Sequence, residues 1–220
     1  MFNKMLIIIL ALWFVFIIFS AFLWTSPAEG LGEYTRILYF HVPVAWVTVM
    51  AFLISAVSSI IYLKKQQLYF DILTEASNQI GFIFCILATV TGSIWAKLSW
   101  GSFWNWDPRE TSIFILLLIY AAYFALRSAV EQPDRKATLS SAYSIFAFIT
   151  VPFLVFVIPR VYSSLHPDPI INVRTKIDMD RTMLLTFLGS LLGHTLLFLQ
   201  ILKIKMTLEK IKMNVQYIKD

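Results

Sequence analysis

The residues best suited to chemistry gather between positions 95 and 112, where four of the seven tryptophans fall. These four are Trp95, Trp100, Trp104 and Trp106. On a helix, Trp100, Phe103 and Trp104 would share one face, because residues three and four apart lie side by side. A plain interfacial belt would place only one or two tryptophans at each helix end. The spacing therefore predicts an aromatic platform at a membrane surface, suited to a planar, apolar ligand.

Three histidines are the next candidates. His41 precedes a Val-Pro pair at the start of a long apolar stretch, His166 lies in a polar segment, and His194 lies inside another apolar stretch. Imidazole nitrogens are common axial ligands of haem iron, and an aromatic surface suits the porphyrin face. We therefore expect His41 and His166 to hold haem iron beside the tryptophans. We expect His194 to be satisfied by hydrogen bonds within the membrane.

The charged residues after the tryptophans suggest two roles. Asp107 is a good N-cap, Pro108 suits the first helical position and Glu110 completes a capping box. Capping does not explain Arg109, because a cation in the first turn opposes the helix dipole. Haem carries two propionates, and the arginine fork suits a carboxylate. The cations expected to face them are Arg36, Lys97, Arg109, Arg160 and Arg174.

Other reaction chemistries find little support. A zinc site needs three or four close ligands, but the single cysteine, Cys85, lies in an apolar stretch and no His-x-x-x-His occurs. No Ser-His-Asp, Cys-His or paired-carboxylate arrangement offers a nucleophile. We expect a protein that acts by positioning a bound group, and whether it is an enzyme stays open.

The composition decides the broad class. Of the 220 residues, 59% are apolar and 14% are charged, against roughly a quarter charged in an average soluble domain. A soluble chain of this size leaves roughly 30% of its unfolded surface exposed and could not hide so much apolar area. The net charge of +5 comes from cations that flank apolar runs rather than form a basic face. The composition therefore excludes a soluble enzyme, a disordered protein and a nucleic-acid binder. We expect the chain to be surrounded by membrane lipid.

Six apolar stretches are long enough to span the hydrocarbon, which needs about 20 helical residues. We expect an all-α integral membrane protein, a bundle of six transmembrane helices with short helical loops on the outer face. The chain 1–220 is expected to form a single domain. The predicted spans are residues 5–24, 37–63, 79–96, 111–127, 140–159 and 183–202.

The distribution of Lys and Arg predicts the orientation. Eleven of them, five in the C-terminal tail, flank one side of the predicted spans, and seven flank the other. We expect the lysine-rich side and both termini to be cytoplasmic in the cytoplasmic (inner) membrane. The outer face then carries segments 25–40, 97–110 and 160–182, with the tryptophans, His41 and His166. The inner segments 64–78 and 128–139 are expected to be plain connectors.

The motifs also resemble a known family. The run Trp-Gly-Ser-Phe-Trp-Asn-Trp-Asp at 100–107 resembles the tryptophan-rich signature of haem-handling proteins of cytochrome c biogenesis. The His-Val-Pro within residues 36–43 is similar to the first histidine region of the CcmC family. Thr91-Gly92-Ser93 and Leu165-His166 fit the same family. The resemblance covers residues 30–170 approximately.

This resemblance implies a site and partners. Proteins of the CcmC type bind haem b at the outer face of the membrane and present it to a CcmE-type haem chaperone. They associate with the CcmA and CcmB subunits of an ABC transporter. Carried over by position, His41 and His166 are the axial ligands of the haem iron. The platform is made by Trp100, Trp104, Trp106 and Asp107.

Alternatives stay open at this point. The run Asp-Pro-Arg-Glu-Thr at 107–111 is closer to the CcsA or ResC synthases, which points to a subunit of a cytochrome c synthase. A haem-transporting subunit of an ABC exporter would need a polar path through the spans. A cytochrome b-type electron carrier would place paired histidines inside the spans, where only His194 lies.

Overall fold

The computed structural model describes residues 4–28, 30–166 and 179–219 of the chain. In these ranges, six helical stretches are long and apolar enough to cross a membrane, which confirms the predicted all-α membrane fold. In chain order the elements are α1 (Lys4–Phe19), the π-helical turn η1 (Ser20–Trp24), the 3-10 helix η2 (Glu33–Ile37), α2 (Leu38–Lys65), α3 (Leu68–Trp100), α4 (Pro108–Ala129), α5 (Pro133–Pro152), the π-helical turn η3 (Phe153–Val157), α6 (Ile158–Val161) and α7 (Arg181–Lys219).

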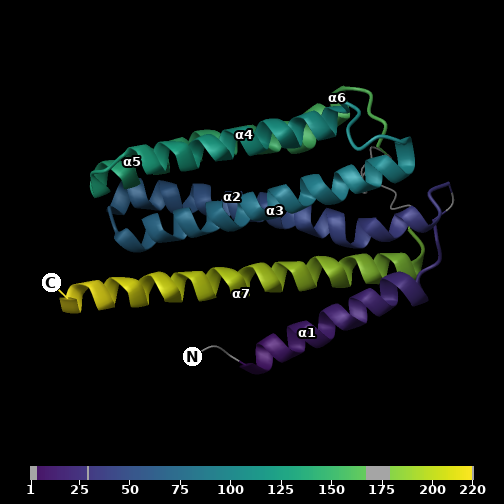
Figure 1. Ribbon diagram of the computed structural model, residues 1–220, viewed down its shortest axis with the longest axis horizontal. Helices are drawn as coiled ribbons and strands as arrows, with labels where there is room; N and C mark the ends of the chain where they lie inside the picture. Colours follow the sequence, from purple (N-terminus) through teal and green to yellow (C-terminus); the bar gives the residue numbers. More distant parts are fainter. Residues whose placement is uncertain (1–3, 29, 167–178, 220) are drawn as a thin grey trace.

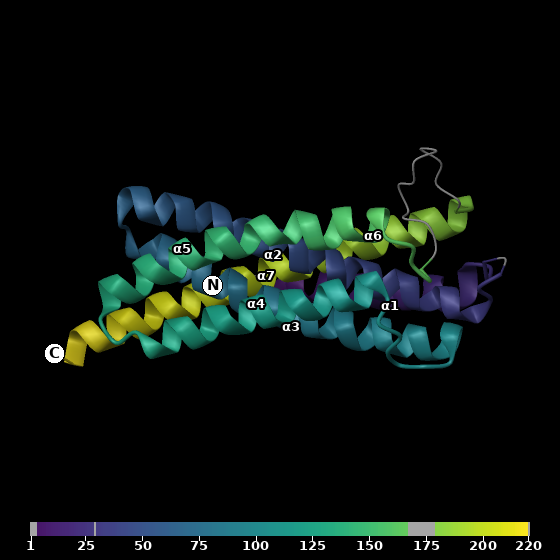
Figure 2. The same cartoon turned by 90° about the horizontal axis from the view of Figure 1, so that it is seen from above.

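The helices share one long axis, and the bundle has two distinct ends (Figures 1 and 2). We call one the tryptophan end; it holds residues 25–28, 30–37, 101–107 and 158–166 and the start of α7 (Figure 1). The other, the lysine end, holds the C-terminal end of α7 and the turns at 66–67 and 130–132 (Figure 1). The start of α1 lies in the same half of the bundle but short of this end, because α1 is much shorter than α7. The described parts of the three predicted outer segments therefore lie together, as their charge and aromatic content suggested.

Three helices extend beyond the predicted spans. Helix α3 begins at Leu68 rather than near residue 79, α5 begins at Pro133 rather than 140, and α7 continues to Lys219. The prediction that 64–78 and 128–139 are plain connectors is therefore wrong, since most of both segments is helical. Apolarity marks only the part of a helix that lies in hydrocarbon, and a helix with polar side chains can continue past it.

Small side chains allow close packing at the centre of the bundle. Helices α2 and α3 lie in its middle layer, with α4 and α5 on one side and α7 and α1 on the other (Figure 1). A Cβ atom added at Gly81 of α3 would come within 2.7 Å of Cε1 of Phe52 on α2. The ring of Phe52 in turn stacks on Tyr120 of α4. Close backbone approach through small residues is a common way to pack helices in lipid, where burial of apolar area supplies little driving force.

A buried ion network joins α3 and α4 at the lysine end. Arg127 donates through Nη1 and Nη2 to the two carboxylate oxygens of Asp71, both at 2.8 Å, and through Nη2 to Glu75 at 2.9 Å. The side chains of Arg127 and Asp71 are only 12% and 7% exposed. The network therefore pairs the two acids near the start of α3 with an arginine of α4. Because these charges are paired, α3 can continue as a helix beyond its apolar stretch.

We expect Arg127→Met to lower the free energy of unfolding by about 3–5 kcal/mol, because it leaves the buried Asp71 carboxylate without its partner. Chemical or thermal unfolding of the purified protein in detergent measures this loss. The control is Arg135→Met, which removes an exposed arginine from α5. A double variant, Arg127→Met with Asp71→Leu, should recover part of the loss; equal stability of the Arg127 and Arg135 single variants would contradict the assignment.

Candidate functional site

His41 is held near the start of α2 by contacts from two other helices. Pro43 lacks the N–H that would bond the carbonyl of Tyr39, four residues earlier. The hydroxyl of Ser190 on α7 donates to that carbonyl instead. On the other side, a Cβ atom at Gly92 of α3 would meet Cε1 of His41 at 3.0 Å. The imidazole is thus placed against α3 where only a glycine leaves room.

Thr91 sets the tautomer of His41. The Thr91 hydroxyl donates to the carbonyl of Leu87 at 2.7 Å, so its single proton is already used. The 3.0 Å contact between Thr91 Oγ1 and His41 Nδ1 therefore requires Nδ1 to donate. The lone pair of the neutral ring is then on Nε2, which is the nitrogen able to bind a metal.

The tryptophan segment is not a continuous helix, which corrects one prediction. Helix α3 ends at Trp100, and Gly101 adopts a left-handed conformation with φ of 86°. Nζ of Lys97 donates to the Gly101 carbonyl at 2.8 Å and so closes the helix end. Lys97, one of the cations expected to face the propionates, therefore already has a backbone partner. Trp100, Phe103 and Trp104 therefore do not share a helical face, because the glycine turns the chain after the first of them.

Asp107 and Glu110 form the predicted capping box at the start of α4. Asp107 accepts from the amide of Arg109 at 2.9 Å. Glu110 accepts from the amides of Asn105 and Asp107, at 2.7 and 3.3 Å. The same acid thereby also folds the end of the tryptophan segment back onto α4.

Asp107 also binds the segment that carries His166. Oδ2 of Asp107 accepts from the amide of Leu165 at 2.7 Å and from the hydroxyl of Ser164 at 2.9 Å, and Oδ1 lies 2.9 Å from Nδ1 of His166. Asp107 is only 4% exposed. One buried carboxylate thus joins the end of the tryptophan segment, the start of α4 and residues 164–166.

The electrostatics of this pair favour a neutral imidazole beside a carboxylate. Burial opposes ionisation of Asp107, but the Arg109 and Leu165 amides and the Ser164 hydroxyl outweigh it and lower its pKa below the usual value. Burial lowers the pKa of His166 to about 4, and the charge of Arg109 acts in the same direction, against the opposing effect of Asp107. At neutral pH, Nδ1–H of His166 therefore donates to Asp107, and Nε2 carries the lone pair.

The four tryptophans divide into two pairs. Trp95 and Trp100 contact each other at 4.8 Å between ring centroids, and both contact the ring of His166, at 5.3 and 4.7 Å. Trp104 instead packs edge-on against Trp106 and Phe114. Trp106 is 74% exposed. One pair therefore supports the histidine, and the other presents aromatic surface at the end of the bundle.

The expected cations have different surroundings. Arg109 lies near enough to both imidazoles for its charge to act on each of them. Arg36 is engaged elsewhere: it pairs with Glu33, donates to the Ala21 carbonyl and lies over the Phe22 ring. Arg160 donates to the carbonyl of Phe156. Arg174 lies outside the described residues, and the role of all four toward propionates stays a prediction.

His194 is separate from this arrangement. Its Nδ1 lies 2.9 Å from the carbonyl of Ser190 on the same helix, and its ring packs edge-on against Phe14 of α1. The bundle therefore satisfies it, as expected. Sequence reasoning did not assign Thr91 or Ser164 a role; the only signals for them were the Thr-Gly-Ser motif and the closeness of Ser164 to His166 in the chain.

We expect Asp107→Ala to lower the free energy of unfolding by about 1–2 kcal/mol, because the N-cap of α4 is lost. Asp107→Asn keeps an N-cap acceptor and should lose less than Asp107→Ala, but its amide nitrogen cannot accept from the Leu165 amide as Oδ2 does, so the recovery is partial. Thermal unfolding in detergent compares them, with Glu131→Ala, the loss of an exposed acid between α4 and α5, as control. Equal destabilisation by Ala and Asn would mean that capping is not what Asp107 contributes.

The chain is similar to known proteins over most of its length. The family model described as "Heme exporter protein C" (CcmC) matches residues 1–219. Heme exporter protein C of Bradyrhizobium diazoefficiens is 30% identical over 167 residues, which cover 76% of this chain and 63% of that protein. The putative cytochrome c biosynthesis ccmC-like mitochondrial protein of Marchantia polymorpha is 32% identical over 157 residues, 70% of this chain and 66% of that protein.

Heme exporter protein C of Escherichia coli K12 is 29% identical over 173 residues, which cover 78% of this chain and 69% of that protein. The match thus spans slightly less than two thirds of the Bradyrhizobium and Marchantia proteins. The family resemblance inferred from the tryptophan and histidine motifs is confirmed: the chain belongs to the Heme exporter protein C (CcmC) family.

Proposed function

We propose that this chain binds haem b between His41 and His166 and presents it to a haem chaperone during cytochrome c biogenesis. The observation that carries the proposal is that the two histidines have the same tautomer, with the proton on Nδ1. In each, Nδ1–H donates to a fixed acceptor, Thr91 or Asp107, which leaves the Nε2 lone pair for iron. Such outer hydrogen bonds orient a metal-binding imidazole and raise its basicity.

The surroundings suit a haem rather than a bare metal ion. Trp95 and Trp100 line the ring of His166, Trp104 and Trp106 add aromatic surface, and Arg109 supplies positive charge near both imidazoles. The chain has one cysteine, so no Cys-x-x-Cys-His is present to attach the group covalently. The proposed cargo is therefore haem b, held only by ligation, stacking and charge.

The proposed role is to position the haem for a partner. The chain offers no nucleophile of its own, so bond formation falls to a CcmE-type chaperone, with CcmA and CcmB as the associated ABC transporter subunits. The exposed ring of Trp106, together with Phe103, supplies contact surface at the tryptophan end. We place that end at the outer face of the cytoplasmic membrane and both termini in the cytoplasm, in agreement with the excess of Lys and Arg at the lysine end.

The first test is the visible spectrum and pyridine haemochrome content of the purified protein, expressed with ample haem. We expect haem b in the wild type, and a weakened or altered Soret and α-band signature in both His41→Ala and His166→Ala, because each loses one axial ligand. His194→Gln is the matched control, since it changes a histidine outside the site and should leave the spectrum unchanged.

Unchanged spectra in both single alanine variants would refute the ligand assignment. Loss of haem in His194→Gln to the same extent as in His41→Ala would also count against it, because haem loss would then follow general destabilisation. No haem in the wild type would remove the basis of the proposed function.

A second test separates a haem binder from a subunit that moves haem through the bilayer. The chain is expressed with a CcmE-type chaperone in cells that lack the CcmA and CcmB subunits. We expect the chain to carry haem still, because the proposed site lies at one end of the bundle and needs no transport step. Haem that appears on the chain only when both ABC subunits are present would favour the transport function instead.

A further inference from the structure

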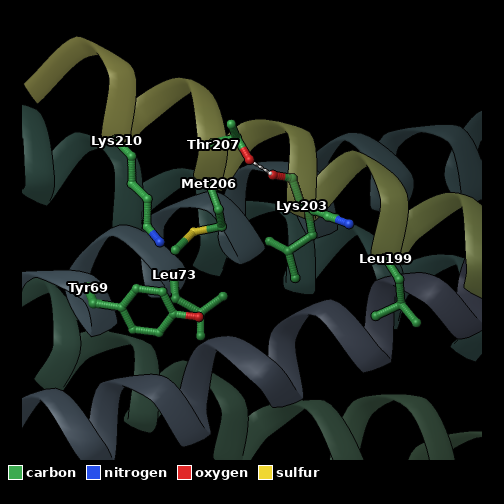
Figure 3. A pocket seen from close by; sticks show the side chains of 8 residues that line it. Tyr69, Leu73, Leu199, Lys203, Met206, Thr207 and Lys210 are labelled. Atoms are coloured by element: carbon green, nitrogen blue, oxygen red, sulfur yellow. Dashed lines mark hydrogen bonds between the residues drawn. The ribbon is translucent and has the colours of Figure 1, made fainter. Parts of the chain in front are cut away.

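A groove at the lysine end has no part in the proposed haem site. It encloses about 390 Å³ between the start of α3 and the second half of α7. Its apolar lining comes from Leu73, Leu199, Leu202 and Met206. Lys203 and Lys210 border it, and Tyr69 and Thr207 complete the lining (Figure 3). The groove thus combines an apolar floor with two exposed cations.

The position of these lysines along α7 matches the profile of a bilayer leaflet. Residues 182–202 are 21 consecutive positions of α7 without Lys, Arg, Asp or Glu. At the rise of an α-helix they extend about 31 Å, close to the roughly 30 Å of the hydrocarbon core. Lys203 therefore lies at the hydrocarbon boundary, and Lys210 lies about 10 Å farther out, at the depth of the headgroups.

The charges around the groove are not balanced by acids from its own lining. None of the eight lining residues is acidic. Nζ of Lys210 lies over the Tyr69 ring, 5.5 Å from its centre, in a cation–π contact (Figure 3). The acids of the neighbouring elements are engaged elsewhere, Asp71 and Glu75 with Arg127, and Glu209 with Lys212.

We propose that this groove binds one anionic phospholipid of the leaflet at the lysine end. An acyl chain lies on Leu199 and Leu202, and the headgroup phosphate lies between Lys203 and Lys210, over Leu73 and Met206 (Figure 3). Along α7, Leu199 and Leu202 precede Lys203 and Lys210, as the acyl chain precedes the headgroup of a lipid along the membrane normal. Basic pockets between transmembrane helices are known to select anionic lipids in this way.

The test uses the full chain, purified in an uncharged detergent, with phosphatidylglycerol as the probe. Phosphatidylcholine of the same acyl composition and inorganic phosphate are the comparison ligands. Binding is followed by the rise in melting temperature, which reports ligation to the folded state, and by native mass spectrometry. We expect phosphatidylglycerol to raise the melting temperature and to stay bound, and the other two to have no such effect.

Two variants locate the site. Lys203→Gln with Lys210→Gln should weaken the apparent affinity for phosphatidylglycerol by about tenfold or more. The matched control, Lys64→Gln with Lys205→Gln, removes the same charge from the same end of the bundle outside the groove and should change the affinity little. Leu73→Trp, which fills the floor and keeps both lysines, should also abolish retention of the lipid.

Several results would overturn the proposal. Equal weakening by the two lysine pairs would mean that general surface charge attracts the lipid. An equal effect of inorganic phosphate, or full lipid retention in Leu73→Trp, would mean a site for a free anion. A dimer in the wild type that Leu73→Trp dissociates would assign the groove to a second copy of the chain. Equal binding of phosphatidylglycerol and phosphatidylcholine would refute a site for anionic phospholipid.

Discussion

The buried carboxylate of Asp107 is the interaction on which the tryptophan end depends. It caps α4, accepts from the amide of Leu165 and from the hydroxyl of Ser164, and orients Nδ1 of His166. A carboxylate can accept several hydrogen bonds at once, and removal from water makes each of them stronger. A single side chain therefore fixes the end of the tryptophan segment, the start of a spanning helix and the orientation of a histidine.

The second histidine is positioned by different means. His41 depends on helix packing: Gly92 lets α3 approach its ring, Thr91 orients Nδ1, and Ser190 of α7 satisfies the carbonyl that Pro43 leaves open. His166 depends on an ionised partner in a loop. The two imidazoles thus have the same tautomer, but one donates to a neutral hydroxyl and the other to a carboxylate.

The two ends of the bundle carry different kinds of side chain. The tryptophan end collects aromatic rings, His41, His166 and the capping box of α4. The lysine end collects the buried Arg127 network and the groove along α7. Long helices such as α3 and α7 extend beyond the hydrocarbon there, because charged side chains in water or in ion pairs no longer oppose the helix.

The sequence by itself determined the membrane class, the six spans, the gathering of the outer segments and the capping box at 107–110, since apolar periods and helix caps are local signals. It also singled out His41 and His166. Only the tertiary structure decided that Asp107 meets His166 across 59 positions and that Thr91 meets His41 across 50. It also decided that the tryptophans form two pairs rather than one face, because Gly101 ends α3. These contacts depend on how distant helices pack, and no local pattern specifies that packing.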